Sequence, residues 1–311
     1  MTAATKLLTV VIPVYNRAGI VNRTLASVHS QNLDDTAIIL VDNNSTDATY
    51  DLLASWRDSM RQAGRDVTLL SESRPGAPAA RNRGLEATGS PWVMFFDSDD
   101  EMTPGHIEGV VGSIRKLPEA DIIGWEISQQ LPSGKRHKGR FKTRRPIWNH
   151  LMHGTLSTQR YAVRTALVME AGAWNPEMRG WNDYELGVRL LVRQPHMVKL
   201  KGERVVTHFS AESITGSRFS DDPQKWEQAL DAVDATLMNT GCPTIWTDVR
   251  RAILAGRYRR EGARSEARRL MDETLLRHNG AWSRVALRLI AMKERILPVG
   301  TTTFARLFFR R

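Results

Sequence analysis

The segment Pro91-Trp92-Val93-Met94-Phe95-Phe96-Asp97-Ser98-Asp99-Asp100-Glu101 decides the fold that we expect for this chain. Five apolar residues run without interruption and end at a group of four acidic residues. An apolar run of this length and aromatic content is typical of a strand that is buried on both faces of a parallel sheet. The acids would then lie at the carboxyl end of the strand, where open α/β sheets bind their ligands.

Two of these acids, Asp97 and Asp99, are spaced so that their side chains would share a face if the strand continued. Carboxylates held this close repel each other unless a cation lies between them. Hard oxygen ligands suit Mg²⁺ or Mn²⁺, which can in turn hold substrate phosphates. Taken alone, the four acids fit an ordinary solvated turn equally well, so the rest of the chain has to decide.

Upstream of this segment, strand and helix patterns alternate. Apolar runs typical of buried strands occupy residues 7–14, 36–41 and 67–70, with helical patterns between them. The segment from Gly76 to Gly84 is a glycine-bearing turn followed by small residues, which allow close approach to a ligand or to the sheet. This alternation predicts an α/β fold with a mainly parallel sheet flanked by helices.

The composition is that of a globular protein with a large core. The 311 residues are 41% hydrophobic and 25% charged, which is ordinary for a soluble protein. The single cysteine, Cys242, excludes an intramolecular disulfide and a thiolate metal cluster, so we expect a reducing, cytoplasmic location. Neither a secretory signal pattern nor an apolar run of roughly 20 residues is found, so neither a leader nor a spanning helix is expected.

The net charge of +10 is concentrated near the C-terminus. Residues 246–311 contain 16 Lys and Arg against 6 Asp and Glu, whereas residues 1–245 contain 28 of each sign. Helical patterns dominate beyond residue 216, which predicts an α/β domain over residues 1–215 and a basic helical region over residues 216–311. Such a region can bind nucleic acid, an anionic membrane or an acidic partner, and its charge alone does not choose among them.

The last long helical pattern offers two interpretations. A helix that begins at Ser283 places apolar residues on one face and arginines beside it, the former being Val285, Leu289, Met292 and Ile296 and the latter Arg284, Arg288 and Arg295. Such a helix could lie on the anionic inner face of a membrane. A helix packed on the domain of residues 1–215, with its basic side in solvent, fits the pattern equally well.

Five segments, in their order and approximate spacing, resemble the motifs of family 2 glycosyltransferases with the GT-A fold. They are Val11-Ile12-Pro13-Val14-Tyr15-Asn16, Val41-Asp42-Asn43-Asn44-Ser45-Thr46-Asp47, Gly76 to Gly84, Phe96-Asp97-Ser98-Asp99-Asp100, and Trp181-Asn182-Asp183-Tyr184-Glu185-Leu186 to Arg189. The resemblance covers about residues 6–210. It implies an inverting enzyme that moves a sugar from a nucleotide-diphospho-sugar to the hydroxyl of a glycan or lipid-linked acceptor, as in surface polysaccharide biosynthesis.

The resemblance also implies roles for individual residues. The donor would be bound by Pro13, Tyr15, Asn16, Asp42, Asn44, Arg81, Asp97 and Ser98. Asp99 would bind a divalent cation, Mn²⁺ or Mg²⁺, and His208 would reach the same cation or the diphosphate. Asp183 would be the general base, with Trp181, Asn182 and Glu185 beside the acceptor.

The chemistry explains this division of roles. A sugar hydroxyl is a poor nucleophile, so a base must take its proton as the new bond forms. The leaving nucleoside diphosphate develops negative charge, which a cation at Asp99 would neutralise. The two functions act on opposite sides of the anomeric carbon. This explains why Asp99 and Asp183 are far apart in sequence and are not expected to form one cluster.

The chain departs from the family pattern at two positions. Asn43 stands where the family often has a second acid, so base recognition falls mainly on Asp42, although Asn43 can still hydrogen-bond a base edge. Asn182 stands where a glutamate is common before the base, so Glu185 stays a second candidate for that role. Asp183 by itself also fits an ordinary acid in the first turn of a helix.

Two other classes of function fit less well. A sugar-phosphate nucleotidyltransferase needs a glycine-rich, basic loop after the first strand, and residues 13–16 do not form one. A nucleic-acid-binding protein would use the basic C-terminal helices in a salt-dependent way. The balanced charge of residues 1–245 and the acidic strand end argue against nucleic acid in that part of the chain.

Overall fold

The computed structural model describes residues 6–130, 134–208 and 218–309, and it divides the chain into two compact units. The first unit contains residues 1–144 and 155–209, and the second contains residues 145–154 and 210–311. The boundary predicted at residue 215 lies outside the described residues. The sequence interpretation does not anticipate that residues 145–154 join the C-terminal helices.

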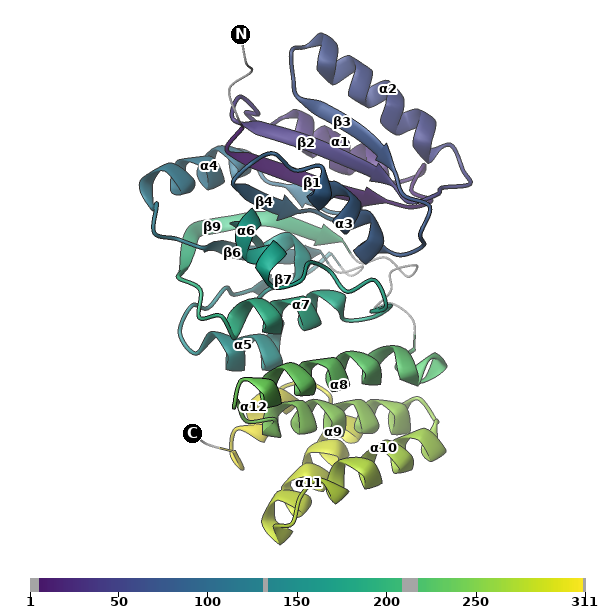
Figure 1. The fold of residues 1–311 in the computed structure, drawn as a ribbon. Coiled ribbons are helices and arrows are strands. Elements are labelled where there is room, and N and C mark those ends of the chain that lie inside the picture. Colours follow the sequence, from purple (N-terminus) through teal and green to yellow (C-terminus); the bar gives the residue numbers. More distant parts are fainter. Residues whose placement is uncertain (1–5, 131–133, 209–217, 310–311) are drawn as a thin grey trace. The chain divides into compact units, whose positions relative to one another are not determined.

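The first unit is built on a mixed sheet in which, over the described residues, the strand order is β3-β2-β1-β4-β8-β6-β9-β5, with β7 paired to β6 (Figure 1). The strands are β1 (Leu8–Val14), β2 (Thr36–Asp42), β3 (Val67–Ser71), β4 (Trp92–Phe95), β5 (Glu101–Met102), β6 (Ile122–Gln130), β7 (Arg136–Gly139), β8 (Tyr161–Arg164) and β9 (Met197–His208). The helices of this unit are α1 (Val21–His29), α2 (Thr49–Gln62), α3 (Ala77–Glu86), α4 (His106–Lys116), α6 (Thr165–Glu170) and α7 (Asn182–Leu191).

Four neighbouring strands, β3, β2, β1 and β4, are parallel, as the alternating pattern predicts. Val14 of β1 is in register with Asp42 of β2, and Val11 pairs with Phe95 of β4. The loops that follow β1, β2 and β4 therefore meet at one edge of the sheet. The α/β fold with flanking helices is confirmed, and the sheet becomes mixed beyond β4, because β8 is antiparallel to both β4 and β6.

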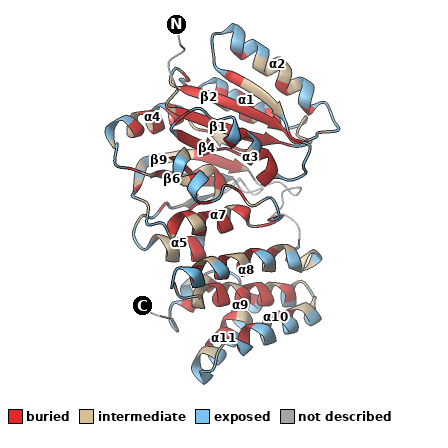
Figure 2. Cartoon of the chain, viewed as in Figure 1, coloured by how far each residue is buried: buried red, intermediate tan, exposed pale blue. Residues whose placement is uncertain are grey.

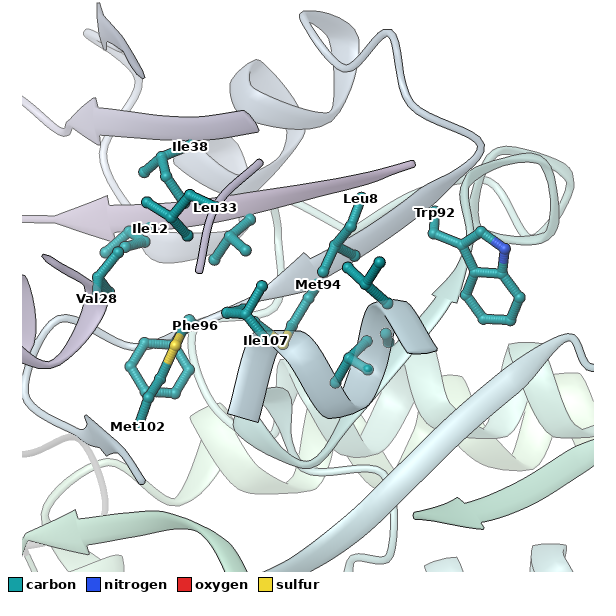
Figure 3. Packing of buried hydrophobic residues seen from close by; sticks show 14 of the residues in the cluster. Leu8, Ile12, Val28, Leu33, Ile38, Trp92, Met94, Phe96, Met102 and Ile107 are labelled. Atoms are coloured by element: carbon teal, nitrogen blue, oxygen red, sulfur yellow. The ribbon is translucent and has the colours of Figure 1, made fainter. Parts of the chain in front are cut away.

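The core of the first unit explains why these runs form strands. Every residue of β1 is buried (Figure 2). Leu8, Val10 and Ile12 share one hydrophobic cluster with residues of α1, α2 and α4, and Figure 3 shows Leu8 and Ile12 within it. The opposite face of β1 carries Val11, which packs against α3. A Cβ atom on Gly84 would lie 2.3 Å from Val11 Cγ1, so the small residues of this helix serve its close approach to the sheet.

Two segments are not predicted by their sequence patterns. The apolar positions from Ala162 to Ala171 do not assign an element to this segment, which begins as strand β8 and becomes helical at Thr165. The patterns at residues 196–200 and 204–209 suggest two short strands, whereas β9 is one strand with irregular pairing to β6. In both places pairing with distant strands outweighs the local pattern.

The second unit is helical over its described residues. Its helices are α5 (Pro146–His153), α8 (Pro223–Asn239), α9 (Ile245–Arg260), α10 (Arg264–Leu276), α11 (Ala281–Ile296) and α12 (Thr301–Ala305). Residues of α5, α9, α10, α11 and α12 share one hydrophobic cluster, to which Met152, Val249, Leu275, Leu287 and Ala305 belong. No helix in the described part of the chain is long and apolar enough to cross a membrane.

Candidate active site

The acidic segment that follows β4 forms a turn. Strand β4 ends at Phe95, and the Phe96 N–H still donates to the Val11 carbonyl oxygen at 2.9 Å. The Asp100 N–H then donates back to the Asp97 carbonyl oxygen at 3.4 Å. Asp97 and Asp99 therefore belong to a turn at the strand end and do not share the face of a continuing strand.

The carboxyl groups of this turn repel one another. Burial and then the charge of Asp97 raise the pKa of Asp99. The pKa of Asp100 lies well above its usual range because of burial first, and then because of the charges of Asp97 and Asp99. A bound cation would relieve this repulsion, since opposite charge favours the ionised form of a carboxylate.

His208 lies beside the acidic turn, at the end of β9. Its backbone N–H donates to Asp100 Oδ1 at 3.2 Å, and its Nε2 is 3.3 Å from Glu101 Oε1. Burial and the positive charge of Arg23 lower the pKa of this histidine. Arg23 also donates to the Asp99 carbonyl oxygen at 2.6 Å, a contact that sequence patterns did not indicate.

The side chains of the turn fit a divalent cation only if substrate completes its coordination. Among the described residues, no group of three or more His, Cys, Asp or Glu side chains is placed to hold a metal ion. Magnesium-like ions are often held by one or two carboxylates together with water and substrate phosphates. Asp99 and its neighbour Asp97 are such a donor set, and their mutual repulsion is the observation that supports the fit.

Asp42 lies at the end of β2 with one carboxylate oxygen unused. Its side chain is buried, and Oδ2 accepts a hydrogen bond from the Ser45 N–H at 3.1 Å. Oδ1 is buried without a hydrogen-bond partner. A buried acceptor without a donor is costly, so a ligand N–H at this position would be stabilising.

The other residues predicted to bind the donor surround the loops after β1 and β2. Pro13 is buried in β1, and the next residue but one, Tyr15, leaves the sheet with 56% of its surface exposed. Asn16 has a φ of 47° and accepts the Thr46 N–H at 2.8 Å, which ties the two loops together. Asn44 is exposed with a φ of 62°.

Asn43 links three chain segments. Its amide nitrogen donates to the carbonyl oxygens of Glu72 at 2.9 Å and Arg74 at 2.7 Å. Its Oδ1 accepts the Gly76 N–H at 2.8 Å, at the start of α3. Both amide hydrogens of Asn43 are therefore used within the chain, and neither is left for a ligand.

Arg81 connects the acidic turn to α7. This buried side chain donates from Nη2 to Asp97 Oδ1 at 2.8 Å and from Nη1 to Asn182 Oδ1 at 3.0 Å. Its guanidinium carbon lies 4.4 Å from the centre of the Trp174 ring. Asn82 fixes Trp174 by accepting its N–H at 2.9 Å and donating to its carbonyl at 2.7 Å. Sequence patterns gave no signal for Trp174, because its role depends on contacts over 90 residues apart in the chain.

Asp183 lies in the first turn of α7, next to Asn182. Trp181 precedes the helix with a φ of 47°, and Asp183 Oδ1 accepts the Tyr184 N–H at 2.8 Å. Burial is the main cause that raises the pKa of Asp183, the charge of Arg81 opposes it, and the charge of Asp97 adds to it. The carboxyl group thus interacts electrostatically with the acidic turn although the two are far apart in sequence.

Glu185 is committed elsewhere. It is buried and forms a two-pronged ion pair with Arg189 one helical turn later, with oxygen to nitrogen distances of 2.6 and 2.7 Å. Of the two predicted candidates for the base, Glu185 is therefore the one whose oxygens are already occupied within the chain.

Comparison with known sequences identifies related proteins. The sequence model described as "Glycosyl transferase family 2" matches residues 9–167, about half of the chain. Over 113 residues the chain is 39% identical to the succinoglycan biosynthesis protein ExoW of Rhizobium meliloti, and over 109 residues it is 34% identical to the amylovoran biosynthesis glycosyltransferase AmsB of Erwinia amylovora. Each match covers 35% of this chain, and only 34% of ExoW and 36% of AmsB, so the chain spans about a third of these relatives.

Comparison with solved structures extends the likeness of fold to nearly the whole chain. The structure of TarS residues 1–349 from S. aureus, solved with UDP-GlcNAc, has a TM-score of 0.65 at 15% identity and covers 97% of this chain and 88% of that one. The mannosyltransferase PcManGT of Pyrobaculum calidifontis, solved with GDP-Man and Mn²⁺, has a TM-score of 0.57 at 16% identity, with 98% and 85% covered. At this identity the likeness establishes a shared fold.

Proposed function

The chain belongs to glycosyl transferase family 2, and we propose that it transfers a sugar from a nucleotide-diphospho-sugar to an acceptor hydroxyl with inversion. The observation that carries this proposal is the pair of contacts through which Arg81 links Asp97 to Asn182. These two contacts support a single site that contains both the acidic turn and Asp183. In this site the acidic turn would serve the leaving group, and Asp183 would serve the nucleophile.

On the donor side, Asp42 would accept an N–H of the nucleotide base through its unused Oδ1. Tyr15 would stack on the base, and Asn16, Asn44 and Ser98 would complete the pocket from the strand ends. UDP-GlcNAc and GDP-Man are the donors bound in the two similar structures, and they support a nucleotide-sugar donor for this chain without identifying it.

Asp99, with Asp97 and His208 nearby, would hold a divalent cation. That cation would supply positive charge to the diphosphate as it leaves. The residues of the chain have their own part in this step, because Arg81 fixes the orientation of Asp97 and the His208 N–H fixes that of Asp100. The manganese bound to the similar mannosyltransferase supports this assignment.

On the acceptor side, Asp183 would take the proton of the attacking hydroxyl. A general base works best when its pKa approaches the working pH, and the raised pKa of Asp183 moves it in that direction. Trp181 and Asn182 would position a glycan or lipid-linked acceptor next to it. Succinoglycan and amylovoran biosynthesis in the relatives supports a role in polysaccharide assembly, which we propose takes place in the cytoplasm.

A transfer assay tests the proposal. Purified protein would be incubated with Mn²⁺ or Mg²⁺, a panel of nucleotide sugars and mixed acceptors, and nucleoside diphosphate release would be measured. We expect Asp99→Asn and Asp183→Asn each to lower turnover by at least about 100-fold, and chelation of divalent ions to abolish it. Asp51→Asn, at an exposed position of α2, is the matched control. Unchanged turnover in both site variants would refute the mechanism.

A further inference from the structure

Helix α11 has two apolar faces. Ala286, Leu287 and Ile290 are buried, and the latter two share a cluster with Val249 and Ile253 of α9. A surface helix normally needs only one such face. A second set of apolar residues recurs at helical spacing on α11: Trp282, Val285, Leu289, Met292 and Ile296, called here the α11 stripe. All of them are exposed except Leu289, which is half-buried.

The α11 stripe is strongly exposed. The exposed fractions are 63% for Trp282, 45% for Val285, 51% for Met292 and 73% for Ile296. The chain that follows adds Leu297, Val299 and Leu307, which are 58%, 77% and 60% exposed. Scattered apolar residues on a surface are normal, but an apolar row along one helix marks an interaction surface.

Unpaired arginines lie along one side of the α11 stripe. Arg284, Arg288 and Arg295 are exposed, and none of them forms an ion pair with any residue that the structure describes. Other arginines of the second unit do form such pairs, for example Arg251 with Asp234 at 2.7 Å and Arg257 with Glu294 at 3.1 Å. The positive charge beside the stripe is thus available to an external anion.

We infer that the α11 stripe docks on an anionic lipid bilayer. A helix with aliphatic residues, a tryptophan and flanking arginines can bury its apolar face at the boundary of headgroups and acyl chains, while its arginines reach the lipid phosphates. A second copy of the chain fits this surface less well, since an antiparallel two-fold contact through the stripe would bring the arginines of the two copies to the same side. This inference concerns the second unit and holds whatever sugar the first unit transfers.

Vesicle flotation with the full chain tests the inference. We expect binding to phosphatidylcholine vesicles that contain about a third phosphatidylglycerol, weaker binding at raised salt, and little binding to phosphatidylcholine alone. Met292→Ser with Ile296→Ser should weaken binding by about tenfold or more, since both side chains lose their apolar burial in the bilayer. Met238→Ser with Leu276→Ser, which replaces two equally exposed residues on α8 and α10, should leave binding unchanged.

The arginines have their own matched comparison. Replacing Arg284, Arg288 and Arg295 by glutamine should weaken binding to the anionic vesicles far more than replacing Arg259, Arg264 and Arg268, which removes the same charge from exposed positions outside the stripe. Thermal melting of each variant checks that it is folded. Equal binding by the two triple variants, or by the stripe variant and the wild type, would overturn the inference. So would light scattering that shows a dimer which the Met292→Ser, Ile296→Ser variant dissociates.

Discussion

The ionised carboxylate of Asp183 lowers the stability of the folded protein. Burial raises the pKa of its carboxyl group, so protonation stabilises the folded state and stability rises as the pH falls through that raised pKa. The ionised form that a base requires is therefore unfavourable to the fold at neutral pH. We expect Asp183→Asn to raise the melting temperature while it abolishes transfer. A lower melting temperature for the variant would contradict this explanation.

The raised pKa of Asp183 should also affect the pH dependence of the reaction. As the base must be ionised, kcat/KM should fall as the pH drops through the pKa of Asp183, at a higher pH than an ordinary aspartate would give. The measurement is a profile of kcat/KM against pH at saturating divalent ion. An acid limb in the usual aspartate range would argue that another group, or an unshifted Asp183, takes the proton.

Asp42 leads to a prediction about the nucleotide. Oδ2 is used by Ser45, and the amide hydrogens of Asn43 are used within the chain, so Oδ1 is the acceptor left for a base. Uracil offers one ring N–H, whereas guanine offers a ring N–H and an amino group and would leave a donor unsatisfied. We expect UDP to stabilise the protein against heat more than GDP does, and Asp42→Asn to weaken UDP binding by about tenfold. Equal shifts with UDP and GDP would contradict this.

At the scale of elements, Arg81 determines how α3, α7 and the end of β4 are held together. A lysine carries the same charge, but its single nitrogen cannot reproduce the two fixed directions in which Nη1 and Nη2 donate to Asn182 and Asp97. We expect Arg81→Lys to lower kcat by about 10- to 100-fold with a smaller change in donor KM. Arg83→Lys, on an exposed turn of the same helix, is the control. A change confined to donor KM would make Arg81 a donor ligand alone.

The elements also show what could be predicted from sequence. Strands β1, β2 and β4 can be predicted from their apolar runs, because a strand buried on both faces needs apolar residues throughout. Asp97, Asp99 and Asp183 can be selected as candidates because they lie in segments that resemble the family motifs. Strand β8 could not be predicted, because it depends on antiparallel pairing with β4 and β6, which are distant in sequence. The contact of Arg81 with Asn182 spans 101 residues, a distance over which local patterns carry no information.

At the scale of the whole molecule, each unit has its own core, and that of the second unit contains buried charges. Arg251 is 4% exposed and contacts Asp234 at 2.7 Å and Asp248 at 3.2 Å, while Arg277 also contacts Asp248, at 3.1 Å. Two carboxylates are thus neutralised by two guanidinium groups. The arrangement is stable only as long as both partners of each pair are present, because an unpaired buried charge is costly.

Arg251→Met should therefore destabilise the second unit by about 3 kcal/mol or more, because it leaves Asp234 and Asp248 with one cation between them. Calorimetric melting would measure this loss, with the exposed Arg268→Met as a control for the removal of one positive charge. Every residue proposed to bind the donor lies in the first unit, so nucleoside diphosphate binding should persist at temperatures where the variant is folded. Loss of nucleotide binding in a folded Arg251→Met protein would show instead that the second unit helps to form the donor site.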